Sequence, residues 1–195
     1  MRFLLYAFVF LFSNIVWAAP GDLKVYGSDA PAKFYLFTSL TCAHCATFHN
    51  KIFPNLIKKY VDTKKAQLTV VDFVSSTNGL FATAAIRCIN GKQTEQLEDD
   101  LYANQKRWMH AEPDITKKEI TRFASLSGMD KSKLDACFSN LEMQEKMLDS
   151  RRQLVSLYNI NSTPTLLVRK GSQVYTLVGS NKKEIEKELD EIFQE

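Results

Sequence analysis

After its first twelve residues the sequence contains no apolar run long enough to cross a membrane, since a spanning helix needs about 20 predominantly apolar residues. It contains no internal repeat and no low-complexity tract. Its 25 Lys and Arg residues nearly balance its 22 Asp and Glu residues, and a net charge of +3 is too small to indicate a nucleic-acid partner. The 45% of hydrophobic residues is ample for a core, so we expect a globular protein of one domain, with room for an insertion.

The first 18 residues have the three parts of a secretory signal. Arg2 supplies a positive charge, Phe3–Phe12 is an unbroken apolar run, and Val16-Trp17-Ala18 offers a cleavage site. We predict that residues 1–18 are a signal peptide cut after Ala18 and that the protein is exported. An uncleaved membrane anchor is the alternative, which the shortness of the apolar run disfavours.

The hydrophobic pattern predicts an α/β protein whose sheet is interrupted by a helical block. Short β-branched or apolar runs predict strands. Apolar residues at helical spacing predict helices, and Pro54 is expected to kink the first of them. The predicted strands are Leu23–Tyr26, Phe34–Phe37, Leu68–Val74, Thr165–Arg169 and Val174–Val178. The predicted helices run from Cys42 to about Tyr60, over Leu80–Ile89, Thr94–Arg107, Lys117–Leu126, Lys131–Asn140 and Glu142–Tyr158, and from about Asn181, which with Glu184 forms a capping-box pattern.

A C-x-x-C motif, Cys42-Ala43-His44-Cys45, stands where the predicted strand Phe34–Phe37 gives way to a helix. The first N–H groups of a helix have no partner within it, and the helix dipole adds positive potential there. We therefore expect Cys42 to have a depressed pKa and to act as the nucleophile. His44 is expected to assist when it points toward the sulfur. Cys45, one turn further along, is expected to be the more buried thiol that closes a disulfide with Cys42 and resolves mixed disulfides.

Three other interpretations of the motif remain open. Cys42, Cys45 and His49 have the C-x2-C-x3-H spacing of a zinc site, but only His110 is left to complete a tetrahedron. An inert structural disulfide would also persist in an exported protein. A binding protein without catalytic activity would use the same surface, and only in that class would Cys42→Ser leave the activity intact. Redox chemistry is favoured, and we predict neither a metal nor a cofactor.

Thr163-Pro164 forms the second half of the predicted site. It lies in a polar stretch just before a predicted strand, where a proline is common and usually trans. Next to a helix-start C-x-x-C motif a cis bond becomes more plausible, because a cis proline makes a tight turn. Such a turn would expose the Thr163 backbone for pairing with an extended substrate peptide.

Together these motifs resemble the DsbA-like family of bacterial thiol–disulfide interchange proteins, in the branch of the alphaproteobacteria that is shared with Gram-positive DsbA-like proteins. The resemblance covers nearly the whole chain after residue 18. It is carried by residues 27–31 (GSDAP), 42–49 (CAHCATFH), 60–64 (YVDTK) and 160–164 (INSTP). It implies a thioredoxin fold with an inserted α-helical domain. The implied divisions are a thioredoxin-like domain of residues 19–77 and 160–195 and an inserted domain of residues 78–159.

The resemblance also implies an activity and partners. The implied activity is that of a periplasmic oxidase, which passes the Cys42–Cys45 disulfide to reduced exported polypeptides and is re-oxidised by a DsbB-like membrane quinone reductase. Ala43 replaces the proline usual in strong oxidases of the family, and Thr163 also occurs in members that reduce or isomerise disulfides. A disulfide isomerase or reductase kept reduced by a membrane partner is therefore the alternative. Leu36 stands where some DsbA proteins carry a buried acid, so we assign no acid–base carboxylate. Only a short segment precedes the first strand, which leaves no room for an N-terminal dimerisation domain, and we expect a monomer.

The other two cysteines, Cys88 and Cys137, fall on separate predicted helices. Similar pairs in relatives imply a structural disulfide, and two buried free thiols are the alternative. The bond would close a loop of about 50 residues, which the chain-entropy model values at roughly 4 kcal/mol. We predict that Cys88→Ser lowers the free energy of unfolding in denaturant titrations with little loss of thiol exchange. A variant that stays stable but loses exchange would contradict this prediction.

Overall fold

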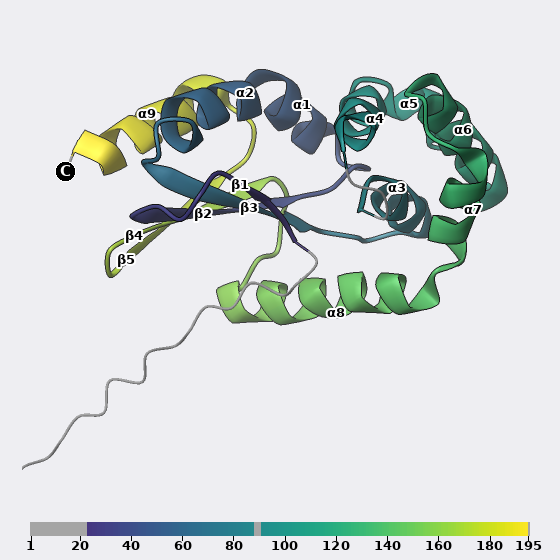
Figure 1. Ribbon diagram of the computed structural model, residues 1–195. Coiled ribbons are helices and arrows are strands. Elements are labelled where there is room, and N and C mark those ends of the chain that lie inside the picture. Colours follow the sequence, from purple (N-terminus) through teal and green to yellow (C-terminus); the bar gives the residue numbers. More distant parts are fainter. Residues whose placement is uncertain (1–22, 88–90, 195) are drawn as a thin grey trace, which may run out of the picture.

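The computed structural model describes residues 23–87 and 91–194, and its centre is a five-stranded mixed sheet (Figure 1). Its strand order is β1-β3-β2-β4-β5, in which β2 and β3 are parallel and all other neighbours are antiparallel. The strands are β1 (Lys24–Tyr26), β2 (Ala32–Thr38), β3 (Ala66–Asp72), β4 (Thr165–Lys170) and β5 (Gln173–Val178). All five predicted strands are confirmed, although β3 begins and ends two residues earlier than predicted.

Helices cover both faces of this sheet (Figure 1). One face carries the helices that follow β2 and the C-terminal helix, whereas the other carries the longest helix, α8. The first group comprises α1 (Ala43–Lys51), α2 (Phe53–Leu56), the π-helical turn η1 (Ile57–Val61) and α9 (Lys182–Gln194), and α8 spans Leu141–Tyr158. The sequence predicts a kink at Pro54, and the structure interrupts the helix at Ile52: α1 ends at Lys51, and α2 begins at Phe53 with Pro54 in its first turn, where the missing N–H costs nothing.

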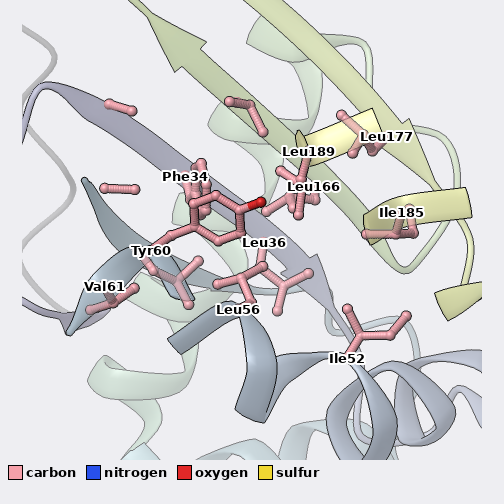
Figure 2. Close-up of a cluster of buried hydrophobic side chains, with 14 of the residues drawn as sticks. Phe34, Leu36, Ile52, Leu56, Tyr60, Val61, Leu166, Leu177, Ile185 and Leu189 are labelled. Atoms are coloured by element: carbon pink, nitrogen blue, oxygen red, sulfur yellow. The ribbon is translucent and has the colours of Figure 1, made fainter. Parts of the chain in front are cut away.

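Both faces of β2 are buried. Successive side chains of a strand point to opposite sides of the sheet, and helices cover both sides. Phe34 and Leu36 pack into the core beneath α1, α2 and α9 (Figure 2). Tyr35 and Phe37 belong to the cluster beneath α8. This double burial explains why residues 34–37 are apolar without alternation. The C-x-x-C motif begins four residues after the end of β2.

Among the described residues between β3 and β4 there are six helices, and five of them gather at one end of the sheet (Figure 1). Their own core is centred on fully buried Trp108, whose indole Nε1–H donates to Leu101 O at 2.7 Å. The predicted helix Thr94–Arg107 is divided at Asn104. The five helices are α3 (Thr77–Arg87), α4 (Lys92–Ala103), α5 (Gln105–Trp108), α6 (Pro113–Leu126) and α7 (Lys131–Ser139). Across the two described ranges, no helix combines the length and apolarity needed to cross a membrane.

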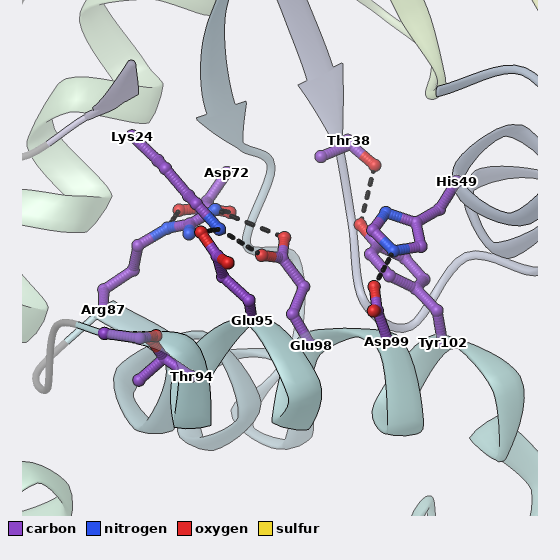
Figure 3. A network of polar contacts seen from close by, with 11 residues as sticks. Lys24, Thr38, His49, Asp72, Arg87, Thr94, Glu95, Glu98, Asp99 and Tyr102 are labelled. Atoms are coloured by element: carbon purple, nitrogen blue, oxygen red, sulfur yellow. Dashed lines mark hydrogen bonds and ion pairs between the residues drawn. The ribbon is translucent and has the colours of Figure 1, made fainter. Parts of the chain in front are cut away.

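A buried ion-pair network joins these helices to the sheet (Figure 3). The guanidinium of Arg87, at the end of α3, donates from Nε and Nη2 to the two carboxylate oxygens of Asp72 at 2.7 and 3.0 Å. Glu98 of α4 lies 3.7 Å from Arg87 Nη2 and accepts a hydrogen bond of 3.0 Å from Lys24 of β1. The network therefore links α3 and α4 to β1 and β3.

Candidate active site

The C-x-x-C motif occupies the turn between β2 and α1. Cys42 is the N-cap residue of α1 and has extended dihedral angles, φ −95° and ψ 121°. Its N–H donates to Ser39 O at 3.1 Å, and its C=O accepts from Ala46 N–H at 3.1 Å. Cys42 is partly exposed, whereas Cys45 is 0% exposed, and both are free thiols. The site is therefore a dithiol with one sulfur open to reagents and one shielded.

The surroundings of Cys42 favour its thiolate. Partial burial alone would raise its pKa, but hydrogen bonds outweigh this effect and hold the pKa below its ordinary value of 9.0. The donors are the backbone N–H groups of Cys45 and His44, together with the side chains of Thr163 and Cys45. Two of them are the orphan N–H groups at the start of a helix, which is the cause expected from the sequence.

Burial dominates at Cys45 and raises its pKa to about 11. Three donors partly offset the burial: the side chains of Thr163 and Thr38, and the N–H of Ser39, which lies 3.3 Å from the sulfur. The charge of a neighbouring Cys42 thiolate raises the pKa of Cys45 further. Of the two thiols, Cys42 therefore loses its proton first as the pH rises, whereas Cys45 keeps its proton to higher pH.

The turn before β4 completes the site. The Thr163–Pro164 peptide bond is cis, and Cys42 Sγ lies 3.4 Å from Thr163 O although 121 residues separate them. Pro164 is buried and its C=O accepts from Gly179 N–H at 2.9 Å, which anchors the turn to the chain after β5. The half-exposed Thr163 backbone therefore borders the accessible sulfur.

His44 is exposed, and its Nδ1 lies 3.4 Å from Ser180 Oγ, just before α9. Its contribution at Cys42 comes through its backbone N–H. The predicted effect of the imidazole ring on the sulfur therefore stays a prediction.

The imidazole of His49, the third residue of the possible zinc spacing, has partners on α4. His49 Nε2 is 2.7 Å from Asp99 Oδ1, and its ring stacks on Tyr102 at 4.4 Å, so its imidazole is engaged beside α4 (Figure 3). Within residues 23–87 and 91–194, no three His, Cys, Asp or Glu side chains converge as metal ligands would. Cys137 is buried and disulfide-bonded, while Cys88 lies outside the described residues, so their pairing stays a prediction.

Two contacts from the inserted helices reach the site and were missed by the sequence reasoning. Gln105 Nε2 donates to Leu40 O at 2.7 Å and to Cys42 O at 2.9 Å, which holds the redox turn from α5. The hydroxyl of Tyr102 is 2.8 Å from Thr38 Oγ1 at the end of β2. Neither contact leaves a local sequence signal, because each joins residues more than 60 positions apart.

Comparisons with known proteins agree with this geometry. A family model described as thioredoxin matches residues 21–190. Two relatives, each named "Putative protein-disulfide oxidoreductase", are from Rickettsia conorii (26% identity over 133 residues, 68% of this chain and 47% of that protein) and Rickettsia bellii (23% over 171 residues, 87% and 65%). The chain thus spans about half to two thirds of the length of these relatives. The crystal structure of Wolbachia pipientis alpha-DsbA1 superposes with a TM-score of 0.77 at 20% identity, covering 89% of this chain and 92% of that one. The predicted fold, a thioredoxin fold with a helical insertion, is confirmed.

Proposed function

The chain belongs to the thioredoxin family, and from that premise we propose that it is a thiol–disulfide oxidoreductase that introduces disulfides into exported proteins through Cys42. The observation that carries the proposal is the unequal dithiol: an accessible Cys42 of lowered pKa beside a shielded Cys45 whose pKa is about 11. The relatives' printed names, which describe protein-disulfide oxidoreductases, support the same chemistry.

The reaction consists of two thiol–disulfide exchanges. A substrate thiolate attacks Sγ of Cys42 in the oxidised protein, so a substrate–Cys42 disulfide forms, the Cys42–Cys45 bond breaks, and its electron pair leaves on Cys45. A second substrate thiolate then attacks the substrate sulfur of this mixed disulfide. The substrate disulfide forms, and Cys42 leaves as a thiolate. The low pKa of Cys42 makes it a good leaving group, so the second exchange favours the oxidised substrate.

Thr163 and Pro164 are proposed to hold the substrate peptide during both exchanges. The Thr163 carbonyl borders Cys42 Sγ at 3.4 Å, and the turn is half-exposed beside it. An extended peptide that pairs with this backbone would bring its own cysteine to the accessible sulfur. The Thr163 side chain acts to lower the pKa of both active-site thiols, so it would in addition stabilise whichever sulfur carries the negative charge.

The cellular setting belongs to the same proposal. Export by residues 1–18 would place the protein in an oxidising periplasm, where its substrates are reduced exported polypeptides. After each cycle the dithiol must lose two electrons and two protons to regain its disulfide, and a DsbB-like membrane quinone reductase is the proposed acceptor. The protein is proposed to act as a monomer, with residues 19–77 and 160–195 carrying the dithiol and residues 78–159 forming the inserted domain.

An isomerase or reductase is the second candidate function, and the residues at two positions favour it. Ala43 is the first residue of α1, where a proline would preorganise the helix start, and Thr163 hydrogen-bonds to both sulfurs. A donor that acts on both thiols favours the Cys42 thiolate over the Cys45 thiolate less than a donor that acts on Cys42 alone. A reductase would be kept reduced by its own membrane partner.

The reduction potential of the Cys42–Cys45 pair decides between the two candidates. We expect equilibration of the protein lacking residues 1–18 with glutathione buffers to give a value well above the roughly −270 mV of thioredoxin, toward the about −120 mV of DsbA. The reason is that thiolate stabilisation favours the reduced state, by about 30 mV for each 1.4 kcal/mol. A value near that of thioredoxin would instead favour the reductase or isomerase.

A further inference from the structure

The Cys45 sulfur lies in a pocket of hydrogen-bond donors. The N–H of Ser39 donates to it at 3.3 Å, and the hydroxyl of the preceding residue, Thr38, acts to lower the pKa of the same thiol. Thr38 is 6% exposed and Cys45 is 0% exposed, so water has little access to this sulfur and does not replace its protein donors. Thr38, the last residue of β2, and Ser39, the residue after it, therefore act on the sulfur that the proposed reaction makes a leaving group.

The Thr38 hydroxyl also contacts the hydroxyl of Tyr102, a residue of α4 (Figure 3). Its hydroxyl is 2.8 Å from Thr38 Oγ1, and the residue is 3% exposed. Burial, together with the nearby carboxylates of Glu98 and Asp72, keeps the pKa of Tyr102 well above its ordinary value, so the phenol stays protonated. When the phenol donates to Thr38 Oγ1, the Thr38 hydrogen is free to point to the Cys45 sulfur.

We propose that the Tyr102–Thr38 hydroxyl pair positions a hydrogen bond on Cys45 that stabilises this sulfur when it leaves as a thiolate. The inference rests on the proposed function. In the first exchange the substrate sulfur bonds to Cys42, the Cys42–Cys45 bond breaks, and the electron pair and negative charge pass to Cys45. No proton has to move in this step, because the attacking thiol has already lost its own. Donors already aligned on the buried sulfur stabilise the charge as it develops.

The sequence positions explain why this arrangement uses the inserted helices. Leu36 provides no acid on β2, and Glu98 is held by Lys24 and Arg87. The shielded side of Cys45 is covered by the core that α4 shares with α1, where Cys45 and Tyr102 both lie. A phenol at position 102 is thus placed to reach the end of β2 without carrying a charge into the core.

The test compares variants that remove single hydroxyl groups. Thr38→Val removes the hydroxyl and keeps the shape, Tyr102→Phe keeps the ring, and Thr38→Ser restores a hydroxyl. Tyr60→Phe is the matched control, because Tyr60 is also a buried tyrosine, with a hydrogen bond of 3.0 Å to Asp190. The first measurement is the second-order rate constant for reduction of the Cys42–Cys45 disulfide by reduced glutathione. The second is the pKa of Cys45, obtained from alkylation rates in a Cys42→Ala background.

We expect Thr38→Val to lower the rate constant about tenfold and to raise the pKa of Cys45, as loss of a hydrogen bond to a charged group should. Tyr102→Phe should act in the same direction by a smaller factor, whereas Thr38→Ser and Tyr60→Phe should match the unsubstituted protein. The pKa of Cys42, measured by thiolate absorbance, should stay unchanged in Thr38→Val and Tyr102→Phe.

A purely structural pair would behave differently. Thr38→Val and Tyr102→Phe would then lower the melting temperature but leave both the rate constant and the pKa of Cys45 as in the unsubstituted protein, and that result would overturn the inference. If the proposed function itself is wrong, the Cys42–Cys45 disulfide of the unsubstituted protein would be reduced by glutathione no faster than a small-molecule disulfide. The two failures are therefore separable in one set of measurements.

Discussion

Cys42→Ala is expected to lower the rate of thiol–disulfide exchange by more than about 1,000-fold, because the site contains no second accessible thiolate. Cys45 is fully shielded, and with a pKa of about 11 only about one molecule in 10,000 carries a Cys45 thiolate at pH 7. The measurement is the rate at which the reduced protein reacts with oxidised glutathione, with folding checked by circular dichroism.

Cys45→Ala is the matched control for this variant. It leaves Cys42 at the start of α1, so Cys42 should still react with disulfides, but the mixed disulfide cannot be resolved and should accumulate. Mass spectrometry distinguishes this trapped species from the unreacted Cys42→Ala protein. Exchange that survives in Cys42→Ala would show that another group performs the chemistry.

The pH dependence of Cys42 follows from its lowered pKa. Its alkylation rate should reach half of its maximum below pH 9, because the thiolate is the reactive form and hydrogen bonds hold the pKa under that value. The thiolate therefore stabilises the reduced protein fully at pH values above the ordinary pKa of 9.0, and this stabilisation is lost as the pH falls through the folded pKa. In the oxidised protein Cys42 is part of a disulfide and has no thiol, so this pH-dependent stabilisation should be absent.

Local sequence patterns were sufficient for the strands, the break near Pro54 and the placement of Cys42 at a helix start. Each of these features depends on residues that are close together in the sequence, so hydrophobic periodicity and the conformational limits of proline are enough to predict it. The cap of α9 is of the same kind: Asn181 Oδ1 accepts from Glu184 N–H at 3.5 Å, which is one half of the predicted capping box.

Contacts between distant segments were beyond reach of the same reasoning. The helix predicted for Thr94–Arg107 gave no sign that it would be divided at Asn104, and this division presents Gln105 to the carbonyls of the redox turn. Likewise, a tyrosine at a helical position reads as a core residue, and only the packing of α4 on α1 shows that its hydroxyl reaches Thr38. Helical periodicity predicts which face is buried but not which element it meets.

Glu98 illustrates the same limit with a larger energetic consequence. As one of several acids in 95–100 it resembles a solvated helix face, yet it is 5% exposed and lies between Arg87 and Lys24. Burial acts to raise its pKa, but the charges of Arg87 and Lys24 outweigh this and lower it. The buried carboxylate is thus stable only while its cations are present.

Arg87→Met is therefore expected to lower the free energy of unfolding at pH 7 by about 3–5 kcal/mol, because it leaves the buried carboxylate of Glu98 and the partly buried one of Asp72 without their shared cation. Chemical denaturation measures the loss, and Lys187→Met is the control, since its exposed pair with Glu191 should contribute less than about 1 kcal/mol.

The pH dependence of this loss identifies its cause. In the unsubstituted protein the lowered pKa of Glu98 gives a stabilisation that is present above its ordinary value of 4.5 and disappears as the pH falls through the folded pKa. Without Arg87, burial should raise the pKa of Glu98, so protonation on acidification relieves the buried charge and stabilises the variant. The difference between the two proteins should consequently be largest near pH 7 and shrink toward pH 4. A difference that stays constant over this range would mean that Arg87 acts through packing of its side chain rather than through its charge.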